Sequence, residues 1–256
     1  MALTASLHPN LQLVVASVLF FLLLVVAREI GALLRRGMER RYPGADENEA
    51  FSLSAVLGLL ALLIGFTFSL ALQRYDARRE LVIAEASALG TTWLRSDLLE
   101  AGPRQQLRQV LRRYVDNRVA FGAAIDADAE RQIYRQSEVL QGELWDTVVE
   151  VVGPFRTTPL AALLVSSTNE SLDLAASRIA TRQAHIPVRI LRILVLYAVI
   201  AAGMVGYQQP RHRQSSLLMF VLITLGVTLV IDLDHPVAGW ISVPQTPMLD
   251  LQRSLQ

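Results

Sequence analysis

Four apolar stretches constrain the fold of this chain more than any other feature of its sequence. The first two are Leu11 to Ala27, with seventeen residues, and Phe51 to Leu72, with twenty-two, and neither contains a charged side chain. As a helix that rises about 1.5 Å per residue, the shorter one spans about 26 Å, close to the thickness of a bilayer core. We therefore predict two membrane-spanning helices, at about residues 11–27 and 51–72.

The other two apolar stretches lie nearer the C-terminus. One covers about residues 190–207, provided that Arg192 extends its side chain to the membrane surface, and the other covers about residues 215–231. Only a short polar loop separates them, which predicts a second helical hairpin. The long segment before this hairpin has ordinary charge density, and its apolar residues recur at the i, i+3, i+4 spacing of amphipathic helices.

The sequence thus predicts an all-α integral membrane protein with about four transmembrane helices and a helical soluble insertion between the second and third. The expected parts are a first transmembrane hairpin at 1–72, a soluble helical domain at 73–189, a second transmembrane hairpin at 190–235 and a C-terminal tail at 236–256. Neither Gly nor Pro follows Leu72 directly, so we expect the second membrane helix to continue into the soluble domain, to about Trp93.

Composition and motifs exclude several classes of function. Cysteine is absent, which rules out disulfides, thiolate nucleophiles and cysteine-ligated metals. The net charge is only +1, so nothing indicates a nucleic-acid partner. There is neither an HExxH motif nor a glycine-rich phosphate loop, and no serine lies in a nucleophile elbow. We expect no enzyme activity, no cofactor and no bound metal; the lipid bilayer is the first expected partner.

Small residues form a stripe on two of the predicted membrane helices. They are Gly58, Ala61, Gly65 and Ser69 on the second helix, and Ala198, Ala202 and Gly206 on the third. Small side chains let helices approach closely in lipid, where packing replaces the hydrophobic drive. The stripes predict either packing within one subunit or a contact between subunits, including a close-packed pore helix.

The second membrane helix also carries a polar stripe and several aromatic residues. Thr67, Arg74, Arg78 and Glu85 fall within a narrow arc of a helix. They could line an ion vestibule, where rings of charge select ions, or form structural salt bridges with neighbouring helices. Phenylalanines at three positions could form a hydrophobic constriction, or simply face lipid or core. These are Phe51, Phe66 and Phe68.

Two further polar clusters interrupt apolar sequence. Asp232, Asp234 and His235 follow the fourth apolar stretch, and they are either a cation site or the polar end of a helix that Pro236 stops. Asn169 and Glu170 lie in an otherwise apolar helical stretch. Their amide and carboxylate groups could form hydrogen bonds across helices.

Several of these residues together resemble a known family. The stretch from Gly65 to Arg79 looks like the hallmark of the bacterial bestrophin-like membrane proteins. Further similarity continues along the chain, in the segments Glu85 to Thr92, Arg113 to Val115, Leu144 to Trp145, Asn169 to Glu170 and Asp232 to Gly239. Thr168 and His235 depart from the family pattern, which has Leu and a basic residue at those positions.

The resemblance implies an oligomeric anion channel with four transmembrane helices and a large soluble part between the second and third. We therefore hypothesise a homo-oligomeric channel for inorganic ions, integral to the inner or plasma membrane of a bacterium. The alternative is a non-conducting sensor or scaffold whose soluble domain binds a ligand or a protein. The arginines in the short loops favour an extracytoplasmic soluble domain, whereas the resemblance implies a cytoplasmic one, so the orientation stays open.

Overall fold

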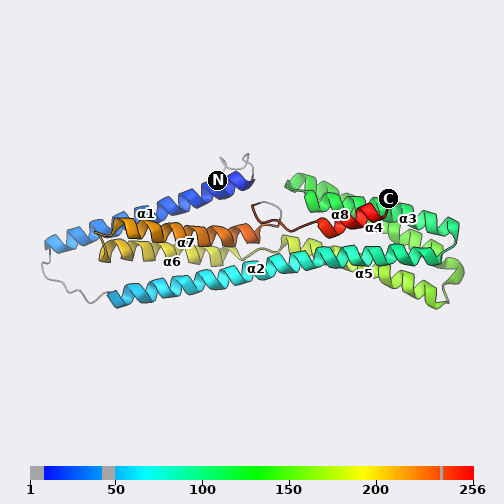
Figure 1. Ribbon diagram of the computed structural model, residues 1–256, viewed down its shortest axis with the longest axis horizontal. Coiled ribbons are helices and arrows are strands. Elements are labelled where there is room, and N and C mark those ends of the chain that lie inside the picture. Colours follow the sequence, from blue (N-terminus) through cyan, green and yellow to red (C-terminus); the bar gives the residue numbers. More distant parts are fainter. Residues whose placement is uncertain (1–8, 42–49, 237–238) are drawn as a thin grey trace. The chain divides into compact units, whose positions relative to one another are not determined.

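All the secondary-structure elements in the part of the chain that the structure describes are helices. This structure is a computed structural model, and it describes residues 9–41, 50–236 and 239–256 (Figure 1). The side chain of Phe51, a candidate for the hydrophobic constriction, lies outside the described part. The helices are α1 (Pro9–Arg41), α2 (Ala50–Arg95), α3 (Ala101–Ala123), α4 (Ala127–Val152), α5 (Pro159–Gln183), α6 (Val188–Gln208), α7 (Arg213–Asp234) and α8 (Thr246–Ser254).

Four stretches of the described chain are long and apolar enough to cross a membrane. They are Asn10–Met38, Ser52–Leu98, Pro159–Gln208 and Arg213–Asp234. The third of them includes both α5 and α6, and the second extends along α2 well beyond the apolar residues. The predicted fold class, an all-α membrane protein with four spans and a helical insertion, is therefore confirmed.

The chain folds into two compact units. The transmembrane unit comprises residues up to Arg74 and residues 185–241, and the helical unit comprises residues 75–184 and 242–256. The sequence predicted limits at residues 72 and 189 and a separate tail, whereas the last fifteen residues belong to the helical unit. The α2 helix passes from one unit into the other without a break and ends at Arg95, two residues beyond the expected end.

Within the transmembrane unit, α1 and α6 pack with their backbones in close contact. A Cβ atom added at Gly31 of α1 would collide with the carbonyl of Gly203 in α6 and would lie 3.0 Å from the amide nitrogen of Tyr207. One added at Gly206 would collide with the carbonyl of Arg28. Glycine is needed at these positions because the opposing atoms are backbone atoms, which cannot rotate away.

The helical unit surrounds an apolar core to which α2, α3, α4, α5 and α8 contribute. Leu107, Leu111 and Tyr114 lie on the inner face of α3, at the helical spacing that the sequence predicted. Leu144 and Val148 of α4 pack into the same core and are fully buried. At about 25 cal/mol for each Å² of apolar surface buried, such a core stabilises this unit substantially.

The end of the chain docks on α3 through α8. Met248 and Leu255 are buried in the core of the helical unit. The carbonyl oxygen of Leu255 accepts a hydrogen bond of 2.7 Å from Nε of Arg112, and Nε2 of Gln252 donates to Asp116 at 2.7 Å. The C-terminal segment is thus an integral part of the helical unit.

Candidate functional site

The small-residue stripe of α2 is open in the described chain. Gly58, Ala61, Gly65 and Ser69 are all exposed. A Cβ atom added at Gly58 or Gly65 would meet no other atom within 4 Å. On α6, by contrast, Ala198, Ala202 and Gly206 are buried, and Gly206 touches α1. The stripe of α6 packs inside the subunit, whereas that of α2 is left for lipid or another chain.

The residues around the middle of α2 point in different directions. Phe66 is 61% exposed, while Phe68 is half-buried. Thr67 is buried, and its hydroxyl donates to the carbonyl oxygens of Leu63 at 2.9 Å and Ile64 at 3.0 Å in the preceding turn. Of the residues proposed for a constriction or vestibule here, Phe66 is the one that projects from the transmembrane unit.

The charged residues further along α2 lie in different surroundings. Arg74 is half-buried. Arg78 is buried, and its guanidinium donates to the carbonyl oxygens of Thr181 at 3.2 Å and Ala184 at 2.7 Å. It therefore satisfies carbonyl groups at the C-terminal end of α5, which have no partner inside that helix. Arg78 joins two helices of one chain and presents no open charge to a vestibule.

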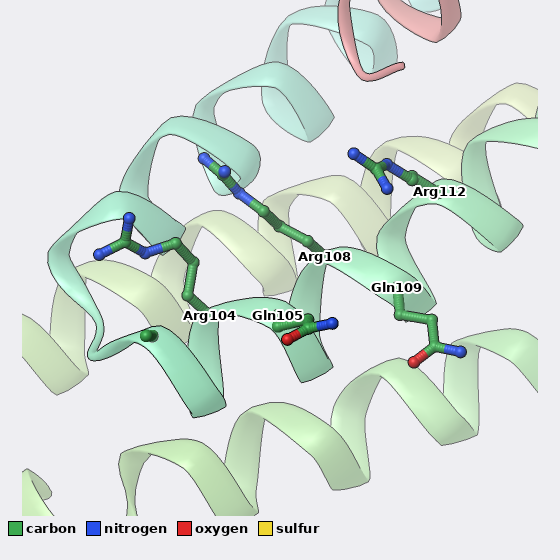
Figure 2. A pocket seen from close by; sticks show the side chains of 6 residues that line it. Arg104, Gln105, Arg108, Gln109 and Arg112 are labelled. Atoms are coloured by element: carbon green, nitrogen blue, oxygen red, sulfur yellow. The ribbon is translucent and has the colours of Figure 1, made fainter.

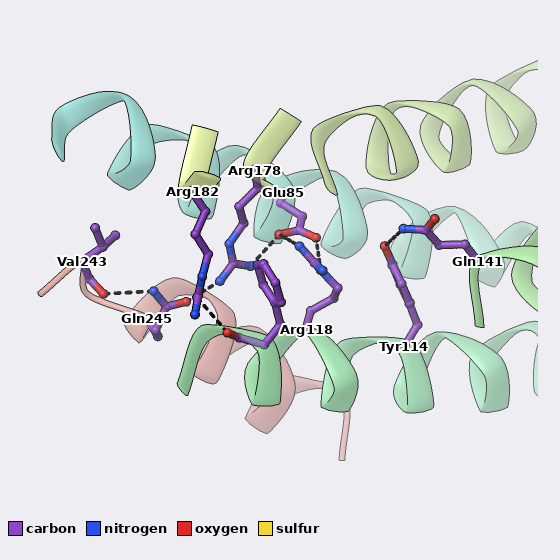
Figure 3. Close-up of polar contacts among 9 residues, drawn as sticks. Glu85, Tyr114, Arg118, Gln141, Arg178, Arg182, Val243 and Gln245 are labelled. Carbon is purple, nitrogen blue, oxygen red and sulfur yellow. Dashed lines mark hydrogen bonds and ion pairs between the residues drawn. The ribbon is translucent and has the colours of Figure 1, made fainter. Parts of the chain in front are cut away.

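Glu85 is fully buried at the centre of an ion-pair network (Figure 3). Its Oε1 accepts from Nε of Arg118 in α3 at 2.5 Å, and its Oε2 accepts from Nη1 of Arg178 in α5 at 2.6 Å. The carboxylate thus connects three helices of the helical unit. Of the two hypotheses for Glu85, these contacts match structural salt bridges, because no exposed surface remains for ions to reach.

The network continues to the C-terminal segment and to α4. Nη2 of Arg178 donates to Oε1 of Gln245 at 2.5 Å, and Nη2 of Arg182 contacts Oε2 of Glu130 at 2.9 Å. The guanidiniums of Arg118, Arg178 and Arg182 also lie around the ring of Phe121. The central guanidinium carbons of Arg118 and Arg182 are each 4.6 Å from the ring centroid. An aromatic face attracts cations, so this ring offsets part of the repulsion among the arginines.

Burial affects the acid–base properties of this network. Desolvation lowers the pKa of Arg178, an effect that the neighbouring Glu85 opposes. Desolvation also lowers the pKa of Arg182, against the effect of Glu130. Burial raises the pKa of the Tyr114 phenol, which accepts a hydrogen bond of 3.0 Å from Gln141. Arginine remains charged at any physiological pH, so the network depends on its charges being paired.

Asp232 and Asp234 form hydrogen bonds with backbone amides. Oδ1 of Asp232 accepts from the amide of Trp240 at 2.9 Å, and its Oδ2 accepts from Ile241 at 3.1 Å. Both oxygens of Asp234 accept from the amide of Ile186, at 3.0 and 3.1 Å. Of the two hypotheses for this cluster, these contacts match the polar end of a helix, with both carboxylates committed to the backbone.

The turn beside Asp232 requires a glycine. Gly239 has φ of 134°, and a Cβ atom there would collide with Oδ1 of Asp232. His235 lies outside this arrangement, exposed, with its Nδ1 2.8 Å from the carbonyl oxygen of Ile231.

Asn169 and Glu170 lie on the exposed face of α5. They line a shallow groove of 730 Å³ together with Ser166, Asp173 and Ser177. The sequence suggested that this pair could form hydrogen bonds across helices; in the described chain both residues are exposed. A second groove, of 570 Å³, runs along α3 and is lined by basic and amide side chains (Figure 2).

Sequence reasoning also missed Arg28, which is buried, and Gln245, which is half-buried. Arg28 of α1 donates to the carbonyl oxygen of Pro210 at 2.8 Å and to Glu29 at 2.8 Å, so it stabilises the loop that follows α6. Its position directly after an apolar stretch was a usable signal. Gln245 gave none, because a single glutamine in a tail carries no spacing pattern.

Comparison with known proteins places this arrangement in a family. The chain matches the family model of the bestrophin-like domain over residues 15–248. The protein belongs to the bestrophin-like family. None of the curated proteins matches this bestrophin-like chain.

Solved structures share the fold at low sequence identity. A crystal structure of a point-mutated bacterial bestrophin homolog from Klebsiella pneumoniae is 14% identical, with a TM-score of 0.71 over 93% of this chain and 97% of that one. The structure of the same organism's bestrophin homolog phased on zinc is 15% identical, with a TM-score of 0.68 over 93% and 96%. A further mutant, described as a membrane protein, is 12% identical, with a TM-score of 0.73 over 93% and 97%. This bestrophin-like protein therefore has their fold and is an integral membrane protein.

Proposed function

We propose that this bestrophin-like protein assembles into a homo-oligomeric ion channel in which α2 lines the conduction path. The observation that carries the proposal is the open face of α2. Its small residues are exposed, with free space beside Gly58 and Gly65, although the helix is one of the four apolar spans. Family membership supports the same proposal, because bestrophins form channels.

In this proposal, Phe66 forms a narrow, apolar part of the conduction path. Its exposed ring lies next to Gly65 and projects from the transmembrane unit. In a ring of subunits, identical phenylalanines form an apolar constriction, and such constrictions control conduction by repelling water. The adjacent small residues leave room for the path to widen on either side.

Anion preference is assigned to Arg74, two turns of helix beyond Phe66. Its Cα lies on the side of α2 opposite Gly65, so the long side chain has to extend around the helix to reach the mouth of the path. Its side chain is half-buried, unlike the enclosed Arg78. A ring of guanidiniums at one mouth of the path would raise the local concentration of anions and repel cations. Chloride is the simplest anion with which to test this proposal.

The test is single-channel recording of the purified protein in planar bilayers. We expect discrete conductance steps in chloride salts, a larger conductance for Phe66→Ala, and a shift of the reversal potential toward cation permeation for Arg74→Glu. Arg131→Glu is the matched control, because this arginine of α4 is exposed in the helical unit. It should leave selectivity unchanged.

Two results would contradict the proposal. One is an intact oligomer that stays silent across anions, cations and voltages, which would favour the non-conducting sensor or scaffold. The other is conduction in which Arg74→Glu and Arg131→Glu behave alike, which would remove Arg74 from the path.

A further inference from the structure

The proposed channel requires two complementary faces on each subunit. Copies of a membrane protein that insert with the same orientation are related by rotation about the membrane normal. A closed ring of three or more copies therefore joins two different faces of the chain, because only a two-fold axis joins a face to itself. The following inference rests on the proposed function and identifies those faces in the helical unit.

One face is basic and belongs to α3. Arg104, Arg108 and Arg112 follow one another at four-residue intervals, so they lie on one side of the helix, with Gln105 and Gln109 beside them (Figure 2). The three arginines line the groove of 570 Å³, and the guanidiniums in Figure 2 rise from the helix in the same direction. We call this set the α3 face.

The arginines of the α3 face are held in place by the helical unit. Nη2 of Arg108 pairs with Asp97 at 2.8 Å, and its guanidinium lies 4.3 Å from the ring centroid of Trp93. Nε of Arg112 donates to the carbonyl oxygen of Leu255 at 2.7 Å. The face has three arginines and a single neighbouring acid, Asp97, so its net charge is positive. Because these side chains are already oriented, less conformational entropy is lost when they bind a partner.

The other face is acidic and belongs to α5. Glu170 and Asp173 are exposed, one turn apart, and within the described residues neither has an ion-pair partner. The remaining exposed residues of this side of the helix are small or neutral: Ala162, Ser166, Asn169 and Ser177. We call this set the α5 face. Its small side chains allow another helix to approach closely, and its two carboxylates can form ion pairs with basic side chains of a partner.

The two faces point away from a common core. Leu107 of α3 and Leu164 of α5 are fully buried in the same apolar cluster, so the opposite sides of these helices face outward. The α4 helix packs against both α3 and α5. In Figure 1, α3 lies along the upper side of the helical unit and α5 along its lower side. One copy can therefore present the α3 face to one neighbour and the α5 face to the other.

We propose that the α3 face of one copy docks on the α5 face of the next copy in the ring. At about 1.5 Å per residue, Arg104 and Arg112 lie about 12 Å apart along α3, and Glu170 and Asp173 lie about 4.5 Å apart along α5. The basic stripe is long enough to contact both carboxylates. Arginine and carboxylate form paired, charge-assisted hydrogen bonds, which would fix how neighbouring subunits align.

Disulfide cross-linking tests this contact directly, because the chain contains no cysteine of its own. The variants combine Gln105→Cys or Gln109→Cys on α3 with Ser166→Cys or Ser177→Cys on α5, which leaves every charge in place. After mild oxidation in membranes, at least one combination should give a ladder of cross-linked multimers on a non-reducing gel. A single cysteine should give no ladder, because the two faces differ.

A matched control uses Gln132→Cys, an exposed position of α4, in place of the α3 cysteine. This pair should give no ladder. In parallel, Glu170→Arg with Asp173→Arg should lower the oligomeric fraction measured by native mass spectrometry. Adding Arg104→Glu and Arg108→Glu to that variant should restore the oligomer, which a general loss of folding would not allow.

Three outcomes overturn the inference, and they separate it from the channel proposal. An oligomer without a ladder from any α3–α5 pair refutes the contact but leaves the channel intact. Cross-linked dimers from a single α3 cysteine show that two α3 faces meet, which also refutes it. A monomer under all conditions refutes both the contact and the proposed function.

Discussion

The α2 and α6 helices carry similar stripes of small residues, but only one of the stripes is used within the subunit. On α6, Ala202 is buried and Gly206 touches the backbone of Arg28 in α1. On α2, Gly58 and Gly65 have open space beside them. A small-residue stripe therefore indicates that a helix is suited to close packing. It does not indicate whether the partner belongs to the same chain.

Charged residues show the same contrast inside the helical unit. Glu85 has no exposed surface and holds two arginines of the same chain. Glu170 and Asp173 are exposed and lack an ion-pair partner within the described residues. The buried acid contributes to folding and the exposed ones are available for assembly, so substitutions of the two kinds should have different consequences.

The largest effect on folding is expected for Gly206→Leu. A Cβ atom at position 206 would already lie 2.7 Å from the carbonyl carbon of Arg28. The leucine side chain would therefore overlap the backbone of Arg28. Overpacking in a core costs about 1–3 kcal/mol when neighbouring side chains can move aside, and occasionally more. Here the opposing atoms belong to the backbone of α1 and cannot rotate away, so we expect the loss to exceed the roughly 3–5 kcal/mol of a broken buried ion pair. We expect little folded protein in detergent, measured by gel filtration and thermal unfolding.

If Gly206→Leu melted at the wild-type temperature, the claim that the α6 stripe is tightly packed within the subunit would be wrong. The same substitution on the open stripe, Gly65→Leu, provides the comparison. It introduces an identical side chain into a membrane helix where nothing lies within 4 Å.

The next largest effect is expected for Glu85→Ala. Removing the carboxylate leaves Arg118 and Arg178 buried without their anion, and breaking a buried pair in this way costs about 3–5 kcal/mol. Chemical denaturation followed by circular dichroism would measure the loss. The matched control is Glu143→Ala, whose ion pair with Arg113 is exposed and should contribute only about 0–1 kcal/mol. Equal losses in the two variants would show that the network does not stabilise the fold.

These contrasts explain what the sequence could and could not predict. Apolar runs of bilayer length determine where helices cross a membrane, so α1, the first part of α2, α6 and α7 were predictable. Periodicity predicted the inner face of α3, because Leu107, Leu111 and Tyr114 recur at helical spacing. Both depend on properties that are local in sequence.

The environment of a polar residue depends on segments that are distant in sequence. Arg78 and Glu85 share a face of α2, yet Arg78 meets the end of α5 and Glu85 meets two arginines, one of them 93 positions away. Nothing near Glu85 in sequence distinguishes a buried acid from one in a vestibule. The same holds for Asp232, whose partners at Trp240 and Ile241 lie beyond a turn that Gly239 makes possible.

A moderate effect is expected for Gln245→Ala in the C-terminal segment. Its side chain accepts from Arg178, donates to the carbonyl oxygen of Val243 at 2.9 Å and fills the space beside Gly122. A buried guanidinium that loses its acceptor costs about 1–3 kcal/mol. We expect a lower denaturation midpoint and faster proteolysis of α8. Gln252→Ala, which removes an exposed hydrogen bond in α8, should change stability by less than about 0.5 kcal/mol.

The smallest effect on folding, and the most informative one, is expected for Gly65→Leu. Nothing lies within 4 Å of the added Cβ atom, so the melting temperature of the isolated subunit should change no more than it does for an ordinary surface substitution. If the open face of α2 lines a path or contacts another copy, the larger side chain must narrow the path or separate the subunits. We therefore expect unchanged folding together with reduced conductance or a reduced oligomeric fraction, read by bilayer recording and native mass spectrometry. Unchanged folding with unchanged conductance and assembly would mean that this face meets only lipid, and α2 would then lose its assigned place in the channel.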